Sequence, residues 1–555
     1  MSRQHHNDMA THRLCESQQY RPRSRARFAI LLVLLLGGSA SWLTSTLTST
    51  ASAAERRQMQ LTIRQATALA LQNNLDIQIA GLTPRIREAQ ITEQKGIFDV
   101  ELKGGFTATD RQLLDTSASF RTADDVVTVD GNAFVGAEDA ELQDLSIGVQ
   151  QLTPYGGTYE VTVSELREDT NRRLTPNFTT GDQAEFYTTQ LRLGFTQPVL
   201  KNFGADVTRN QIHIAQNNLT ISSAEFRQQV IDSTSQVQQT YWELVFRRQD
   251  LQVRRQQLDL AEQLLARVRR QVEVGTLAPI EVLQAETEIA RIHEQIIIAA
   301  NAVHDAEDRL KRTMHLSLVG EFADVEIMPT DSPAYAPPQI NQAAEIAAAL
   351  AQRPDLQQAK LTLDNQNITL VFNENQVLPT LDLAASLRFN GIRDTLGGSI
   401  EEFETKRREW EIGLVFSYPL GNRRAKSRVR QSRLAVRQQL LQIKELEENA
   451  MEEVRRAVRG VLASAELVQA SRAAGRLAQK QLDAEEKKLK VGLATVFTVL
   501  QFQEDLAVER SNEIRSLTQF LQARTNLEAV KSTLLQVNDI VLETNGPQLR
   551  ETPSK

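Results

Sequence analysis

The side chains that most often bind metals or carry out catalysis are few and widely spaced in this sequence. His293, His304 and His315 follow one another at intervals of eleven residues, which on one helix would place neighbours roughly 16 Å apart. One zinc ion cannot bridge that distance, and His213 stands alone. The sequence also lacks a glycine-rich phosphate loop and a nucleophile elbow. We therefore expect surface or packing histidines, with no metal site, no cofactor and no enzyme activity.

The beginning of the chain has the pattern of a secretory signal. Four arginines between positions 21 and 27 precede an apolar run at 28–36, and small residues follow at 51–54. These are the three regions of a signal peptide. A membrane-anchoring helix is the alternative, but the apolar run is far shorter than the ~20 residues that a bilayer span needs. We predict a signal peptide at residues 1–54.

Removal of this segment would leave a cysteine-free and acidic chain. Cys15 is the only cysteine, so neither a disulfide framework nor a thiolate metal site would remain. The formal net charge of the full chain is −7, whereas nucleic-acid binders are more often basic. The richest later apolar stretch, 296–300, is too short to cross a bilayer as a helix. An exported chain of this kind is periplasmic, secreted or a β-barrel.

An internal repeat organises the remaining chain. Three landmarks return in the same order: residues 63–77 at 346–356, 196–200 at 417–421, and 274–275 at 491–492. Shared order and spacing predict a tandem duplication in which each copy runs helix, strands, long helix, glycine turn, long helix. The predicted parts are a first repeat at 55–328, a Pro-rich linker at 329–340, a second repeat at 341–543 and a flexible C-terminal tail at 544–555.

Between the first two landmarks of each copy, apolar and polar residues alternate. The alternating segments are 100–106 and 187–195 in copy one, and 381–389 and 410–418 in copy two. A period of two predicts half-buried strands. Copy one also alternates at 145–149 and 159–163, around a turn sequence at 153–157. The chain therefore supplies four strands to one sheet if this extra pair folds aside, and six if it joins.

Such strands fit either a soluble antiparallel sheet with one wet face or a membrane barrel with apolar residues toward lipid and polar residues toward a lumen. Alternation alone does not decide between them. Strand lengths near the ~9–11 residues that cross a bilayer fit the barrel. Long, polar and acidic connections favour it further; we expect them at 107–142, 165–185 and 391–409.

The helical segments predict long rods. From Pro198 to Pro279 the chain contains no other proline and only two glycines. About 65 helical residues would extend about 100 Å, with an apolar stripe that must pack on other helices. Gly275 and Gly492 are natural helix ends, because glycine accepts the left-handed conformation found there. Each copy is therefore predicted to form an antiparallel helical hairpin.

The hairpin tips carry small and apolar residues where solvent would favour charge. These are Thr276, Leu277 and Ala278 in copy one, and Leu493, Ala494 and Thr495 in copy two. A helix cap alone would account for the Val-Gly pairs. The exposed apolar groups at the end of a rod suggest a docking surface in addition.

In combination these motifs resemble the TolC family of outer-membrane efflux proteins. The resemblance covers residues 58–543 and is carried by the openings at 61–71 and 378–381, by Tyr-Pro-Leu at 418–420 and by Val-Gly-Leu-Ala-Thr at 491–495. It implies a mainly α fold in which internally duplicated long α-helical hairpins form a periplasmic α-barrel. The strands would contribute to a shared trimeric transmembrane β-barrel.

The resemblance also implies a function. The chain would be a homotrimeric exit duct in the outer membrane of the Gram-negative envelope, conducting substrates passively for a tripartite efflux or type I secretion system. A periplasmic adaptor, or membrane fusion protein, would dock on the tips and link them to an inner-membrane pump. The implied docking residues are Val274, Gly275, Thr276, Leu277, Val491, Gly492, Leu493, Ala494 and Thr495.

Some family members close the tunnel with acidic rings and Arg-to-Asp contacts about two helical turns inward from the tip. The matching positions here are Glu281, Gln284, Thr498 and Gln501, of which only the first is charged. We therefore expect closure by helix packing. Two other classes stay open: a periplasmic coiled-coil scaffold, which needs no lipid-facing strands, and an adaptor protein, which usually has one hairpin. The cargo is open as well, since drugs, metal ions and polypeptides use this architecture.

Overall fold

The computed structural model describes residues 57–115, 136–170, 184–317, 322, 325–402, 407–543 and 546–549. All of them belong to one unit, Arg56–Lys555. The predicted linker and both predicted hairpin tips fall within this unit. The expected signal peptide at 1–54, with Cys15, lies outside the described residues.

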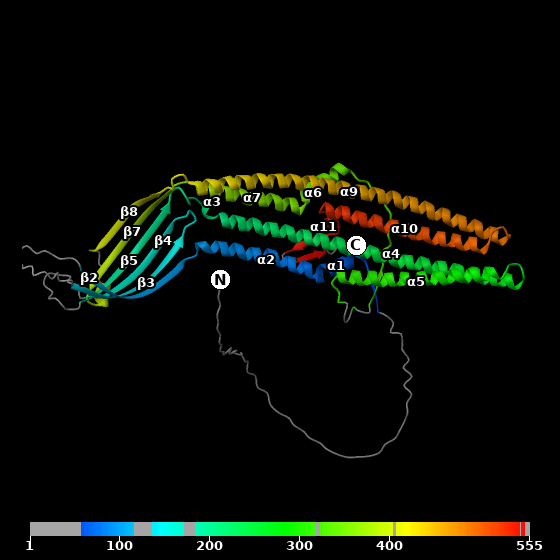
Figure 1. Ribbon diagram of the computed structural model, residues 1–555, viewed down its shortest axis with the longest axis horizontal. Coiled ribbons are helices and arrows are strands. Elements are labelled where there is room, and N and C mark those ends of the chain that lie inside the picture. Colours follow the sequence, from blue (N-terminus) through cyan, green and yellow to red (C-terminus); the bar gives the residue numbers. More distant parts are fainter. Residues whose placement is uncertain are drawn as a thin grey trace, which may run out of the picture. The chain divides into compact units, whose positions relative to one another are not determined.

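Two similar series of elements make up the unit (Figure 1). The first comprises β1 (Gln58–Leu61), α1 (Ile63–Asn73), α2 (Leu75–Lys95), η1 (Gly96–Phe98), β2 (Glu101–Asp115), β3 (Gly136–Leu152), β4 (Thr158–Thr170), β5 (Ala184–Pro198), α3 (Ala205–Thr208), α4 (Asn210–Glu273), α5 (Ile280–Thr313) and β6 (Glu326–Pro329). The second comprises α6 (Gln342–Gln352), α7 (Pro354–Asn375), β7 (Thr380–Arg393), α8 (Leu396–Glu401), β8 (Arg408–Ser417), α9 (Arg423–Lys490), α10 (Val496–Val530), α11 (Leu534–Val537), β9 (Ile540–Glu543) and β10 (Gly546–Leu549). β10, within the segment predicted as a flexible tail, pairs antiparallel with β9.

In each series a single residue separates the first two helices. Asn74 ends α1 and caps α2, where its side-chain oxygen accepts a hydrogen bond from the backbone N–H of Asp76 at 2.8 Å. Arg353 has the same place between α6 and α7 and the same extended backbone, and Pro354 follows it. Proline suits the first position of a helix because no intrahelical bond needs its missing N–H. The shared break is the structural counterpart of the sequence repeat.

The two longest helices follow the strands of each series. α4 has 64 residues and α9 has 68, so each extends about 100 Å, as predicted. α4 packs against α5 and α9 against α10, forming two antiparallel hairpins that lie side by side (Figure 1). No helix in the part of the chain that the structure describes combines the length and the apolar character of a membrane span.

The strands form one six-stranded antiparallel sheet in the order β2-β3-β4-β5-β7-β8. The extra pair in copy one, β3 and β4, is part of this sheet, so the chain supplies six strands. β5 pairs with β7 and thereby joins the two repeats, with Leu191 opposite Phe389. The mainly helical fold with a sheet is confirmed.

The predicted connections between strands are wrong at their ends. β2 continues to Asp115 and β3 begins at Gly136, so much of 107–142 is strand. The connection at 391–409 contains the short helix α8. Strand pairing satisfies backbone hydrogen bonds whatever the side chains are, so pairing runs on past the end of the alternating pattern.

The register gives the sheet two different faces. One face carries apolar side chains on every strand: Leu102 and Phe106; Leu145, Ile147 and Val149; Tyr159, Val161 and Val163; Leu191, Leu193 and Phe195; Leu383, Leu387 and Phe389; Trp410, Ile412, Leu414 and Phe416. These groups are not covered by the chain itself: Leu102 and Trp410, on the two edge strands, are each 70% exposed. The opposite face is mainly polar and charged. An apolar face that its own chain leaves open needs another apolar environment.

The helices are arranged in the same lateral order as the strands. Next to the sheet, α2 packs on α4, α4 on α7 and α7 on α9; farther along, α5 packs on α4, α4 on α10 and α10 on α9. The first series therefore forms one lateral edge of the unit, made of β2 in the sheet, α2 next to the sheet and α5 farther along. The second series forms the opposite edge, made of β8 and α9.

The Pro-rich linker after β6 is fastened to both repeats. The carboxylate of Asp331 lies 2.6 Å from the hydroxyl of Tyr241 on α4 and accepts a hydrogen bond from the backbone N–H of Ile63 at 2.6 Å. The ring of Tyr335 packs on Phe520 of α10 with centroids 5.3 Å apart. The guanidinium of Arg472 on α9 lies over the same tyrosine ring. The linker therefore holds the two hairpins at a fixed level along their length.

We predict that Tyr241→Phe lowers the free energy of unfolding by roughly 1–3 kcal/mol, because the buried carbonyl of Leu61 and the partly buried carboxylate of Asp331 lose their donor. Burial and the hydrogen bond to Asp331 raise the pKa of Tyr241, so the hydroxyl stays protonated. Urea unfolding of the purified protein followed by circular dichroism measures the loss. The control is Tyr155→Phe, since Tyr155 is 60% exposed. Equal loss in both variants would contradict a specific role of the linker contact.

Candidate functional site: the hairpin tips

The turns at the ends of the two hairpins have the same backbone geometry. Gly275 and Gly492 adopt φ values of 79° and 76°, in the left-handed region that favours glycine. One residue on, the N–H of Thr276 donates to the carbonyl of Gln271 at 2.8 Å and that of Leu493 to the carbonyl of Lys488 at 2.9 Å. Such bonds close the end of a helix. No atom lies within 4 Å of a Cβ built on either glycine, so conformation, not space, requires glycine here.

The predicted docking residues divide into exposed and supporting groups. Val274, Val491 and Leu493 are 73%, 70% and 78% exposed. Leu277 instead packs partly into the core beneath the tips. The hydroxyl of Thr495 accepts a hydrogen bond from the N–H of Thr498 at 3.2 Å and so caps α10. Gly275, Thr276, Gly492 and Thr495 are exposed as well, so that of the nine predicted residues only Leu277 and Ala494 are partly buried.

Three apolar residues at the tips were missed by the sequence analysis. Ile280, Leu283 and Phe497 are 54%, 58% and 59% exposed. Ile280 and Phe497 occupy equivalent places in the two repeats, five residues after each glycine. The sequence repeat could have indicated these two residues, because an apolar residue stands at the same position of the second helix in both hairpins.

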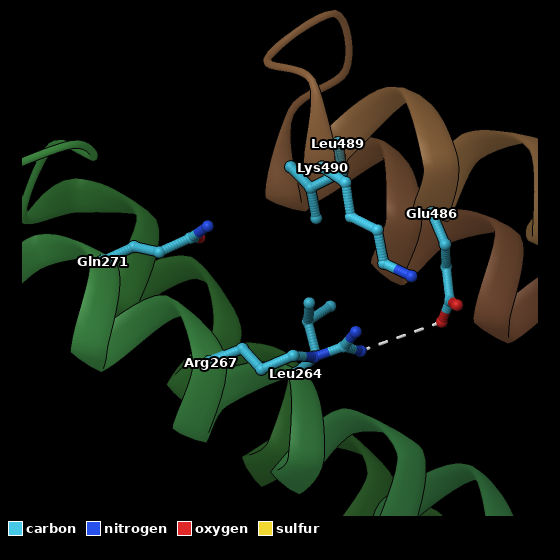
Figure 2. Close-up of a pocket in the computed structure, with 6 residues that line it drawn as sticks. All are labelled: Leu264, Arg267, Gln271, Glu486, Leu489 and Lys490. Carbon is cyan, nitrogen blue, oxygen red and sulfur yellow. Dashed lines mark ion pairs between the residues drawn. The ribbon is translucent and has the colours of Figure 1, made fainter.

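The two hairpins share one core directly behind the tips. Its buried residues come from all four long helices: Ala261, Leu264, Val268, Ala285, Ile292, Ala478, Leu482, Val496, Val499, Leu500 and Leu506. Figure 2 shows a small cavity between α4 and α9 at the edge of this core, lined by Leu264, Arg267, Gln271, Glu486, Leu489 and Lys490. Because the core is common to both hairpins, the tips are held as one surface.

The four gate candidates are not brought together as a lock. Thr498 is engaged in the cap of α10, where its hydroxyl lies 2.8 Å from that of Thr495. Gln501 is exposed, while Glu281 and Gln284 on α5 each bury one oxygen without a hydrogen-bond partner. Within the described ranges, no hydrogen bond or ion pair joins the candidates on α5 to those on α10.

Charged contacts between the hairpins lie farther from the tips, at positions that were not predicted. Arg267 of α4 is 3.8 Å from Glu486 of α9 (Figure 2). Arg291 of α5 donates to Glu504 of α10 at 2.8 Å. The hydrogen bonds that Arg291 donates to Glu504 and Glu288 raise the pKa of Arg291, so its guanidinium stays charged throughout the physiological range. Charged contacts therefore join the two hairpins, but through residues other than the four gate candidates.

The arrangement of duplicated hairpins and sheet is the fold of bacterial outer-membrane channels. The CmeC outer membrane channel of Campylobacter jejuni matches with a TM-score of 0.58 at 13% identity, covering 85% of this chain and 86% of that one. The outer membrane protein VceC of Vibrio cholerae matches with a TM-score of 0.58 at 14% identity, covering 85% and 96%. At this identity the likeness shows the fold alone.

Sequence comparison gives the family. The outer membrane efflux protein model matches residues 159–314 and 346–531, one segment in each repeat, and the chain belongs to this family. Outer membrane efflux protein BepC of Brucella suis biovar 1 (strain 1330) is 25% identical over 305 residues, which are 54% of this chain and 63% of BepC. The alignment thus spans a little under two thirds of that relative. The predicted family is confirmed, and it places the chain in the outer membrane.

Proposed function

We propose that this chain is the outer-membrane exit duct of a tripartite efflux or type I secretion system. Three copies form one ring whose strands cross the outer membrane and whose helices enclose a periplasmic tunnel. Transport is passive and needs no catalytic group, because an inner-membrane pump supplies the energy. A periplasmic adaptor links that pump to the hairpin tips.

The two-faced sheet supports the membrane part of this proposal. The apolar face is continuous over six strands and exposed on the edge strands, as required of a surface that meets lipid. The polar face would line the lumen. Six strands from each of three copies would give a barrel in the size class of the sixteen- to eighteen-stranded porins, which leave an aqueous channel.

The open edges support a ring. β2 and β8 each have one unpaired edge in the described sheet, and unpaired edges invite pairing with another chain. Pairing β2 of one copy with β8 of the next would bring α2 and α5 toward α9 of the neighbour, since the lateral order is the same at every level. A head-to-tail contact of this kind closes when the rotation between copies fits.

The helical edges carry matching apolar stripes. On α2, the exposed residues Leu75, Ile79, Leu82 and Ile86 follow steps of four, three and four, which is the spacing of a coiled-coil seam. Ile77, on the other side of α2, is 2% exposed. On α9, Leu434 and Leu441 are exposed one heptad apart. An apolar stripe that is exposed in one copy can pack against the helical edge of the next copy.

The competing functions account for fewer of these features. A coiled-coil scaffold has no use for the apolar sheet face, and an adaptor usually has one hairpin, whereas this chain has two. The observation that carries the proposal is the six-strand register with one apolar face. Outer-membrane fractionation and gel electrophoresis of unheated and heated samples test it. We expect a membrane-bound trimer that dissociates only on heating. A stable monomer that dissolves without detergent would overturn the proposal.

A further inference from the structure

Two neighbouring rows on the polar face of the sheet each carry three or more charged side chains. The acidic row contains Glu101 on β2, Glu160 on β4 and Glu411 on β8. The next row along the strands contains Lys103 on β2, Arg192 on β5, Arg388 on β7 and Glu409 on β8. Adjacent rows on one face are two residues apart, or roughly 6.6–6.8 Å. Three of the four charges in the second row are positive.

Two of these three cations have acidic partners. The Nζ of Lys103 is 3.4 Å from Glu101. The guanidinium of Arg388 lies 3.5 Å from Glu409 and 3.9 Å from Glu411. Arg192 is exposed and has neither an ion pair nor a side-chain hydrogen bond among the residues that the structure describes. Arg192 is therefore the uncompensated cation of this row.

The neighbours of Arg192 make its position unfavourable without an anion. Arg192 and Arg388 stand directly opposite each other on β5 and β7, and like charges in that relation destabilise a sheet. On the β4 side of Arg192, Glu160 accepts a hydrogen bond from the hydroxyl of Thr162 at 2.9 Å and does not form an ion pair with Arg192. Gly194, two residues along β5 on the same face, has no side chain to fill the space. Local conflicts of this kind are expected at functional sites.

We propose that Arg192, together with Arg388, attracts the anionic groups of passing molecules and favours cargo with a carboxylate or phosphate group. This role rests on the proposed function, in which the polar face lines the tunnel. Guanidinium groups bind carboxylate and phosphate oxygens in a planar, two-pronged geometry. Charged side chains that line a pore determine which ions pass. In a trimer the pair is present three times.

The test is the reversal potential of the full-length protein in a planar bilayer under a KCl gradient. We expect Arg192→Gln to shift it toward cation permeation, Arg192→Glu to shift it farther, and Arg192→Lys to retain the wild-type value. The shift should be large near ~0.1 M salt, where the screening length is about 10 Å, and small near ~1 M, where it is about 3 Å. The control is Arg408→Gln, because Arg408 is paired with Phe389 and lies on the apolar face.

The outcomes separate the two proposals. If Arg192→Gln conducts with the wild-type reversal potential at low salt, or if Arg408→Gln shifts it equally, the role of Arg192 is wrong and the duct remains. If neither the wild-type protein nor any variant conducts, the duct proposal fails and takes this one with it. Outer-membrane trimers of normal yield in all variants show that the sheet has formed.

Discussion

Replacing Leu493 by glutamate should stop export while leaving a normal amount of trimer in the outer membrane. Leu493 is 78% exposed at the tip of the second hairpin, so a charge there costs the isolated fold little. In a docked adaptor interface the same side chain would be buried. The lost apolar contact is worth about 1.5–3 kcal/mol, or roughly a ten- to hundredfold loss of affinity at each tip. Burying the introduced carboxylate would also cost desolvation energy, which weakens binding further.

The measurement is adaptor recovery with the detergent-solubilised, affinity-tagged protein from its own host, together with drug or protein export by that host. Val537→Glu is the matched control, because Val537 is 63% exposed on α11 and adds the same charge away from the tips. Normal adaptor recovery with Leu493→Glu would refute the docking assignment. An equal loss with Val537→Glu would point to a general effect of charge.

Features that depend on local backbone preferences could be predicted from the sequence. The rod from Asn210 to Glu273 follows from the absence of helix breakers over that stretch. The left-handed turns at Gly275 and Gly492 follow because glycine is the residue that reaches that conformation without strain. The tandem order of elements follows from the repeat. These predictions needed no knowledge of which segments meet in space.

Features that depend on partners distant in the sequence could not be predicted. Arg267 and Glu486 meet because the two hairpins pack side by side, and nothing near either residue indicates the other. The strand ends depend on pairing across the sheet, as the extension of β2 to Asp115 illustrates. The family resemblance places Thr498 at a gate position, six residues past the glycine. Its capping contact with Thr495 becomes visible only when the start of α10 is fixed.

Replacing Ile86 by glutamate should break the trimer into monomers. Ile86 belongs to the stripe on α2 that we place against α9 of the next copy, and it is 58% exposed in a single chain. The interface would lose about 1.5–3 kcal/mol of apolar burial and would have to desolvate a carboxylate as well. A ring of three copies repeats this loss at each of its interfaces, so the cost is multiplied. The fold of one copy should be unaffected, because the stripe points away from α4.

Size-exclusion chromatography with light scattering in detergent measures the assembly, and circular dichroism checks that the helices remain. Thr92→Glu is the matched control: Thr92 is exposed on the same helix but, six residues on, lies about 120° around it from Ile86. If the trimer survives Ile86→Glu with wild-type heat resistance, the α2 seam is not the contact between copies. If both variants dissociate alike, added charge anywhere on α2 suffices. Dissociation by Ile86→Glu alone would tie ring closure to the apolar stripe that a single chain leaves open along its α2 edge.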